Sequence, residues 1–212
     1  CIRDSAISVL LSGISVGGQY ALIAIGYTMV YGILRLINFA HGDVFMVSGL
    51  IAIYLTTMGL PLPVTLALAV LITVLLGFLI ERVAYKPLRS APRMSVMISA
   101  IGVSYLLQNC ALYFTGGLPQ IYPTIPFLSE QVQIGSATTK MVTIITPILT
   151  IVLVLLLVLM IKRTKTGMAM RAVSRDFETS ELMGIKINNV ISMTFVIGCF
   201  LAAIGSLLYF TN

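Results

Sequence analysis

The residues best suited to chemistry lie in one short segment between two long apolar runs. Residues 35–43 contain Asn38, the only histidine, His41, and the carboxylate Asp43. Polar groups at membrane depth are costly, so they lie either at an interface or along a water-filled path. Asn38 and His41 are three residues apart and would share a face of a helix. Composition favours an interfacial turn, and a path-lining role for all three residues is the functional alternative.

A second set of polar side chains carries no charge and lies inside apolar runs: Gln19, Thr28, Gln108 and Asn109. Such groups either form hydrogen bonds between helices or face a path through the bundle. Hydrogen bonding between helices is favoured for the set. Gln19 is also a candidate for lining the translocation path, together with Asn38, His41 and Asp43.

Covalent catalysis is not indicated. Ser104 and His41 could form part of an intramembrane hydrolase, but the sequence has no G-x-S-x-G and no evident third group. No G-x-x-x-x-G-K-[ST] phosphate loop occurs either. The sequence therefore predicts no enzyme, no catalytic or metal-binding residue and no bound cofactor.

Composition identifies the elements that must position these residues. Hydrophobic residues make up 58% of the chain and charged residues 9%, against about 25% charged in a soluble domain. The runs 5–34, 44–80, 94–115, 141–161 and 187–212 contain no charged residue or histidine. About 20 apolar residues span a hydrocarbon core as a helix. The fold class is therefore an all-α polytopic transmembrane helix bundle.

The second run is long enough for two spans, which Pro61 and Pro63 divide. Six spans are expected, at 7–34, 40–59, 63–83, 95–115, 141–161 and 190–210. A transmembrane barrel is excluded because residues 152–159 are apolar without alternation.

The first run would be about 45 Å long as a straight helix, against a core of about 30 Å. It must tilt or break, and Gly17-Gly18 is the expected break. Small residues at helical spacing predict close helix packing. They are Gly13 and Gly17 in the first span and Gly198, Ala202 and Ser206 in the last.

Clustered basic residues predict the orientation. They are Arg82, Lys86, Arg89 and Arg93 in one connection, and Lys162, Arg163, Lys165, Arg171, Arg175 and Lys186 in another. By the positive-inside rule both connections are cytoplasmic. The second of them is the loop 162–189, the loop 116–140 is external and the N-terminus lies outside. The net charge of +6 thus reflects topology and not nucleic-acid binding.

Two connections are long enough to have roles of their own. The external loop 116–140 is rich in Pro and Gly and is expected to hold a short strand pair. A solvated loop and a docking surface are equally favoured for it. In the cytoplasmic loop, one helix is expected from Met168 to Met183, with a weakly apolar stripe and a charged face. Such a helix could lie on lipid or fit a groove on a cytosolic partner.

Two long motifs resemble a known family. Residues 18–33, GQYALIAIGYTMVYGI, and 37–43, INFAHGD, resemble the N-terminal signature of branched-chain amino acid ABC permeases, the first of the two paired permease types. Arg171-Ala172, Asp176, residues 182–185 (LMGI) and 194–198 (TFVIG) resemble that family's cytoplasmic coupling loop and next helix. The resemblance covers essentially the whole chain as a single permease domain, 1–212.

The resemblance implies that residues 167–185 form a coupling helix seated in a cleft of an ATPase. The residues it assigns to coupling are Gly167, Arg171, Ala172, Asp176, Phe177, Leu182 and Gly184. Phe177 is expected to pack into the ATPase, with Arg171 and Glu178 fixing its register. The implied partners are two cytosolic ATPases, a second permease, an external amino-acid-binding protein and the lipid of the bacterial inner membrane.

The sequence departs from the family in two respects. Family members continue for about two further spans, so the resemblance implies that the chain is a fragment. Ser180 stands where the coupling loop often has Ala. The implied cargo is leucine, isoleucine or valine, and the alternatives are another small polar solute, such as a sugar or urea, or a passive channel.

Overall fold

The computed structural model describes residues 2–35, 37–89, 91–122, 131–134 and 137–211, with the backbone alone for 2–7, 93, 131–134, 137 and 138. Long apolar helices dominate this part of the chain. They are α1 (Ile2–Leu34), α2 (Ala40–Thr57), α3 (Leu62–Ile80), α4 (Arg93–Thr115), α6 (Met141–Arg163) and α9 (Ile187–Thr211). All six are long and apolar enough to cross a membrane, which confirms the all-α polytopic bundle.

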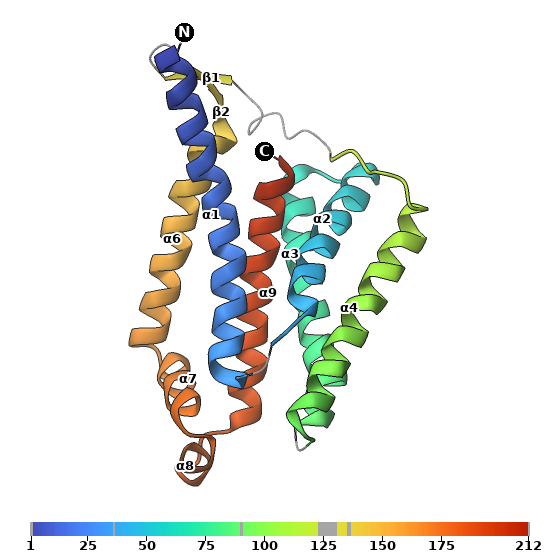
Figure 1. The fold of residues 1–212 in the computed structure, drawn as a ribbon, viewed down its shortest axis with the longest axis vertical. Coiled ribbons are helices and arrows are strands. Elements are labelled where there is room, and N and C mark those ends of the chain that lie inside the picture. The colour runs from blue at the N-terminus through green and yellow to red at the C-terminus, as the bar shows by residue number, and fades with distance from the viewer. Residues whose placement is uncertain (1, 36, 90, 123–130, 135–136, 212) are drawn as a thin grey trace.

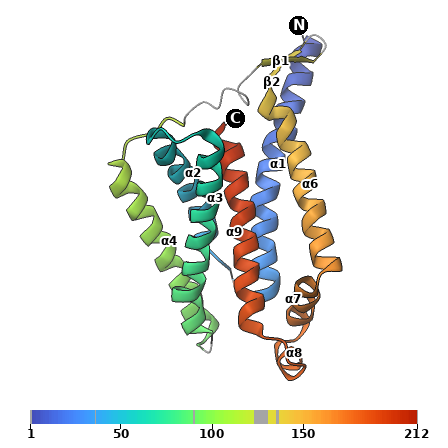
Figure 2. The same cartoon turned by 180° about the vertical axis from the view of Figure 1, so that it is seen from behind.

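The bundle is built around α9, the most buried of the six spans. Figures 1 and 2 show α1 and α6 on one side of α9, with α2, α3 and α4 on the other. Gly198, Ala202 and Ser206 are buried on α9, as their spacing predicts. Gly26 of α1 shows how closely the helices approach, because an added Cβ there would lie 3.0 Å from the Gly198 carbonyl oxygen.

The first helix differs from the prediction at its glycines. It runs unbroken through Gly17-Gly18, because a helix satisfies its own backbone hydrogen bonds in lipid. Gly18 packs instead against α6, where its Cβ would lie 3.0 Å from Thr150 Oγ1. Gly13 and Gly17 face open space among the described residues, so the prediction that they pack within the bundle is wrong. The excess length of α1 lies beside the strand pair at its N-terminal end (Figure 1).

The two ends of the bundle carry different structures. One end, here called the basic end, holds residues 81–89, 91–92 and 164–186. It comprises the π-helical turn η1 (Glu81–Tyr85), the 3-10 turn η2 (Lys86–Leu88), and the short helices α7 (Lys165–Arg175) and α8 (Phe177–Leu182). The opposite end carries the antiparallel strands β1 (Gln131–Ile134) and β2 (Ala137–Lys140). The strand pair expected in loop 116–140 is therefore present, while residues 123–130 and 135–136 of that loop lie outside the described residues.

Candidate functional site

The loop at the basic end forms two helices where the sequence predicts one. Thr164 caps α7 by accepting a hydrogen bond from the Gly167 N–H at 3.0 Å. Asp176 then adopts an extended conformation, with φ −151° and ψ 118°, and ends α7. Its carboxylate accepts the Glu178 N–H at 3.0 Å and the Thr179 hydroxyl, which starts α8. The prediction of a single helix from Met168 to Met183 is therefore wrong. The Asp176 side chain offers the backbone a hydrogen bond that takes the place of those of a continuing helix.

The same cap sets the charge state of Asp176. The Thr179 side-chain and backbone hydrogen bonds, followed by the Glu178 N–H and the positive charge of Arg35, lower the pKa of Asp176. A carboxyl with a lowered folded pKa stabilises the fold above its unfolded value and loses that stabilisation as pH falls through the folded value. The α7–α8 junction is therefore fully capped at neutral pH.

The apolar stripe of this loop faces the chain itself. Met170 and Val173 are buried, and Phe177 packs against the apolar core of the bundle. Phe177 is half-buried and also lines the cavity at the basic end, and its role in contacting a partner stays a prediction. By contrast, Leu182 and Met183 are 87% and 80% exposed. Met168 of α7 is also exposed, at 62%, and neither Met168 nor Met183 was singled out from the sequence as a coupling residue.

The other residues assigned to coupling fall into structural and exposed positions. Gly167 is buried against the last turn of α6, where a Cβ would overlap Ile161 and Met160 backbone atoms. Arg171 and Asp176 are exposed and Ala172 is half-buried. Gly184 has φ +81° and follows α8, a left-handed conformation that glycine adopts without strain.

Arg35 connects this loop to the end of α1. Its backbone has φ +53°, and its guanidinium donates to the carbonyl oxygens of Ser174 and Arg175 at 3.1 and 3.3 Å. Those carbonyls belong to the last turn of α7, where helix carbonyls lack partners and favour positive charge. The connection between α1 and α2, which carries Asn38, is thereby fixed to the α7–α8 loop.

The polar residues of this connection enter the bundle. Asn38 is buried and its Oδ1 accepts the Tyr85 hydroxyl at 2.6 Å. His41 is 2% exposed, lies against Gly26 and has no hydrogen-bond partner on Nε2 within the described structure. Both side chains are therefore buried within the protein, and their role along a translocation path stays a prediction.

Asp43 and Gln19 occupy separate places. Asp43 Oδ1 accepts the Gln108 side-chain N–H at 2.9 Å, which joins α2 to α4. Gln19 is buried and donates to the Leu208 carbonyl at 3.1 Å, so it bonds α1 to α9 as expected for hydrogen bonding between helices. The structure thus brings Asn38, His41 and Asp43 to the start of α2 and leaves Gln19 elsewhere. Ser104 accepts a hydrogen bond from Gln108, an environment different from that of His41.

The Tyr85–Asn38 hydrogen bond gives a measurable contribution to stability. Tyr85→Phe removes the donor and leaves a buried amide oxygen unpaired, which costs about 1–3 kcal/mol. We expect a lower midpoint of thermal unfolding for the detergent-solubilised chain. Tyr113→Phe is the control because Tyr113 is exposed on α4. Equal midpoints for the two variants would contradict a stabilising role for this bond.

The structure also shows a polar cluster that the sequence did not indicate. Glu81 is 0% exposed, pairs with Arg89 and accepts the Ser192 hydroxyl at 2.8 Å. Arg89 also donates to Asn188, so the α3–α4 connection is bonded to the start of α9. The sequence feature that could have pointed to this cluster is a single carboxylate, Glu81, which directly follows an uncharged run.

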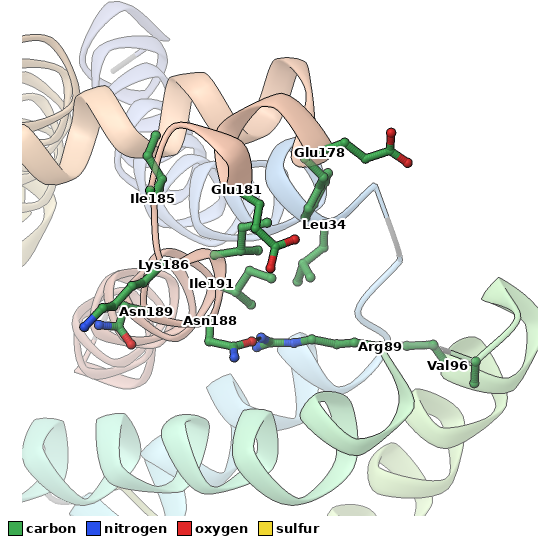
Figure 3. A pocket seen from close by; sticks show the side chains of 14 residues that line it. Leu34, Arg89, Val96, Glu178, Glu181, Ile185, Lys186, Asn188, Asn189 and Ile191 are labelled. Carbon is green, nitrogen blue, oxygen red and sulfur yellow. Dashed lines mark hydrogen bonds between the residues drawn. The ribbon is translucent and has the colours of Figure 1, made fainter.

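Beside this cluster lies a cavity of about 960 Å³ between the α7–α8 loop and the N-terminal end of α4. Figure 3 shows Arg89 extending toward Asn188 on one side of it, with Glu181 of α8 on the other. The basic end therefore combines a buried ion pair, a capped two-helix loop and a cavity between them.

Comparisons with known proteins place this arrangement in a family. A family model described as branched-chain amino acid transport system / permease component matches residues 9–212. The chain is 41% identical over 211 residues to the high-affinity branched-chain amino acid transport system permease protein BraD of Pseudomonas aeruginosa, covering 94% of this chain and 69% of that protein. It is 38% identical over 212 residues to the LivH permease proteins of Escherichia coli K12 and Salmonella typhimurium, covering 94% of this chain and 68% of each.

No solved structure matches the chain. The family match covers nearly all of the chain, including the start of α2 and the two-helix loop. The relatives are named as permease proteins, which agrees with six helices able to span a membrane. The chain is a multi-pass membrane protein and belongs to the family of branched-chain amino acid transport system permease components.

Proposed function

We propose that the chain is the membrane-spanning permease subunit of a bacterial ATP-driven importer for leucine, isoleucine and valine. The observation that carries the proposal is the family match over residues 9–212, together with relatives named for branched-chain amino acid transport. The chain supplies the path across the membrane. ATP is hydrolysed on a separate ATPase chain, and the permease itself binds no cofactor.

The proposal includes an orientation and a set of partners. The basic end faces the cytoplasm, in keeping with the positive-inside rule, and the hairpin end faces outward across the bacterial inner membrane. Two ATPase subunits contact the basic end, and a second, similar permease completes the membrane unit. An external binding protein delivers the amino acid at the opposite end.

The proposed contact with the ATPase is the exposed end of α8. Leu182 and Met183 form a small apolar surface next to the carboxylate Glu181. Exposed apolar residues beside polar ones are typical of docking sites. Arg171 is exposed and is available to the partner, while Gly167, Ala172, Asp176 and Gly184 shape the two helices that present this surface.

Leu182→Asp should weaken association with the ATPase about tenfold or more, because a charge replaces an anchor that becomes desolvated in the complex. The measurement is recovery of the ATPase with the affinity-purified full-length permease. Leu118→Asp is the matched control, since Leu118 is 70% exposed at the opposite end of the bundle. Phe177→Asp would not test docking, because Phe177 packs against the chain's own core.

Unchanged ATPase recovery with Leu182→Asp and Met183→Asp together would refute the proposed contact. That result would not bear on the proposed transport function, which is tested separately.

Transport is tested with the full-length permease and its partners reconstituted in liposomes. ATP-dependent accumulation of labelled leucine that needs the binding protein supports the proposal. Accumulation of a sugar or urea instead would assign a different cargo. Solute flux that continues without ATP or partner subunits would identify a passive channel.

A further inference from the structure

The lipid-facing side of α6 ends in basic residues. Exposed aliphatic residues form a stripe along α6 at helical spacing: Ile148, Val152, Leu155 and Leu159. Lys162 is exposed and continues this spacing, so it lies on the same side at the basic end. The 23 residues of α6 measure about 35 Å, against a hydrocarbon core of about 30 Å. Lys162 and Arg163 therefore lie where lipid headgroups begin.

The helix α7 lies at the same depth. It contacts α6, α1 and α9, and Figures 1 and 2 show it beyond the end of α6, beside the last turns of α1 and the first turns of α9. Gly167, Met170 and Val173 are buried on its inner side. The opposite side is exposed and carries Met168 and cations. A basic face of α7 is therefore turned away from the bundle at the level of the headgroups.

The charges of this loop are segregated between its two helices. Residues 162–175 contain no acidic residue and five basic ones: Lys162, Arg163, Lys165, Arg171 and Arg175. The charged residues of α8 are Glu178 and Glu181. In the part of the chain that the structure describes, the recorded ion pair is Arg89–Glu81. The five cations are therefore left without an acidic partner there.

Resting on the proposed function for the orientation of the basic end, we propose that the exposed face of α7, with Lys162 and Arg163, binds the headgroups of anionic phospholipids in the cytoplasmic leaflet. Clusters of about four to eight Lys and Arg residues bind anionic lipid when they directly follow a span on its cytoplasmic side or lie on an amphipathic helix. Residues 162–175 meet both conditions. Lipid thus holds the outer side of α7, while the exposed end of α8 stays free for the ATPase.

An acidic surface on the ATPase would also neutralise these cations. Lipid is favoured because Lys162 continues the aliphatic stripe of α6. That stripe lies within the depth of the membrane, where a cytosolic protein does not reach. Met168, an exposed apolar residue among the cations, fits the boundary between headgroups and acyl chains.

The test places one tryptophan on this face. Residues 1–212 contain no tryptophan and Met168 is 62% exposed, so Met168→Trp adds a local fluorescent probe. Any tryptophan elsewhere in the full-length permease is first replaced by phenylalanine. The permease is reconstituted alone in phosphatidylcholine vesicles with a minor fraction of phosphatidylglycerol, and one of the two lipids carries bromine on its acyl chains as a quencher. Phosphatidylglycerol should quench the probe more strongly, molecule for molecule, than phosphatidylcholine.

Two double variants remove the same charge from different connections. Lys162→Gln with Lys165→Gln should lower the preference for phosphatidylglycerol about tenfold or more at low salt, because each cation near an anionic surface contributes about fivefold. Arg82→Gln with Lys86→Gln is the matched control and should leave the preference unchanged. Those two residues follow α3 in η1 and η2, on the other side of α9 from α6 (Figure 2). Arg171 is kept in both variants because it belongs to the proposed contact with the ATPase.

The outcomes decide between lipid and protein. A preference that is lost with Lys162→Gln and Lys165→Gln and kept in the control supports the lipid site. Equal quenching by the two lipids, or the same loss in both double variants, overturns it. An unquenched probe whose emission shifts when the ATPase is added also overturns it and assigns the face of α7 to the ATPase.

A second measurement covers a Met168→Trp permease that does not assemble. The double variant at Lys162 and Lys165 should then retain less phosphatidylglycerol after purification than the control, and equal retention overturns the proposal. Neither measurement needs leucine uptake. A permease that fails the transport test can therefore still show the lipid preference, and one that transports leucine can lack it.

Discussion

Arg89→Met is expected to lower the free energy of unfolding by about 3–5 kcal/mol, the cost of removing one partner from a buried ion pair. The reason is Glu81, whose side chain is fully buried while the Arg89 side chain is 20% exposed. Without Arg89 the carboxylate retains only the Ser192 hydroxyl as a recorded side-chain partner. Thermal unfolding of the detergent-solubilised chain, followed by helix content, measures the loss.

Two further variants isolate the ion pair. Arg82→Met changes an exposed arginine of the same turn, and we expect a change within about 0.5 kcal/mol, as for most surface substitutions. Glu81→Gln combined with Arg89→Met should recover stability relative to Arg89→Met alone, since no buried charge remains. A double variant no more stable than Arg89→Met would show that the pair is not the source of the loss.

The six spans could be predicted because composition alone determines them. A run of about 20 apolar residues has few alternatives to a helix in a membrane. The predicted end of the third span, at residue 83, was less accurate, because the helical path continues through Glu81 to Leu88. Glu81 is tolerated there because Arg89 and Ser192 satisfy its oxygens, which no local pattern indicates.

The division of the loop after α6 into two helices had a local signal. Asp176 is followed two residues later by Glu178, an arrangement typical of a helix N-terminus. The helix-forming residues on both sides outweighed this signal in the prediction of a single helix. A cap can end one helix and start the next even where composition favours continuation, because it offers the backbone other hydrogen bonds.

The polar pairs inside the bundle could not be predicted in the same way. Asn38 bonds to Tyr85 across 47 positions, and Glu81 bonds to Ser192 across 111. Hydrophobic periodicity says which residues form a span, but it does not say which spans are neighbours. Asp43 and Gln108 were each noted from the sequence, yet only the structure shows the 2.9 Å hydrogen bond that joins them across α2 and α4.

Two sets of contacts connect the α7–α8 loop to the start of α2. Arg35 bonds to the end of α7, and the connection that follows Arg35 is held by Tyr85 through Asn38. The direction in which α7 leaves α6 therefore affects both the exposed end of α8 and the polar connection inside the bundle. Gly167 determines that direction, because it lies where α7 packs on the last turn of α6.

Gly167→Val should displace α7 from α6, since its Cβ would overlap backbone atoms of Ile161 and Met160 that cannot rotate away. Overpacking of this kind costs about 1–3 kcal/mol, and we expect leucine uptake by the reconstituted transporter to fall about tenfold or more. Gly102→Val is the matched control, because a Cβ at Gly102 meets nothing within 4 Å. The measurements are uptake and the ATP hydrolysed for each leucine moved, which should rise in Gly167→Val as coupling is lost. If Gly167→Val and Gly102→Val transport leucine with the same ATP cost, the path from the α6–α7 junction to the start of α2 does not carry the coupling.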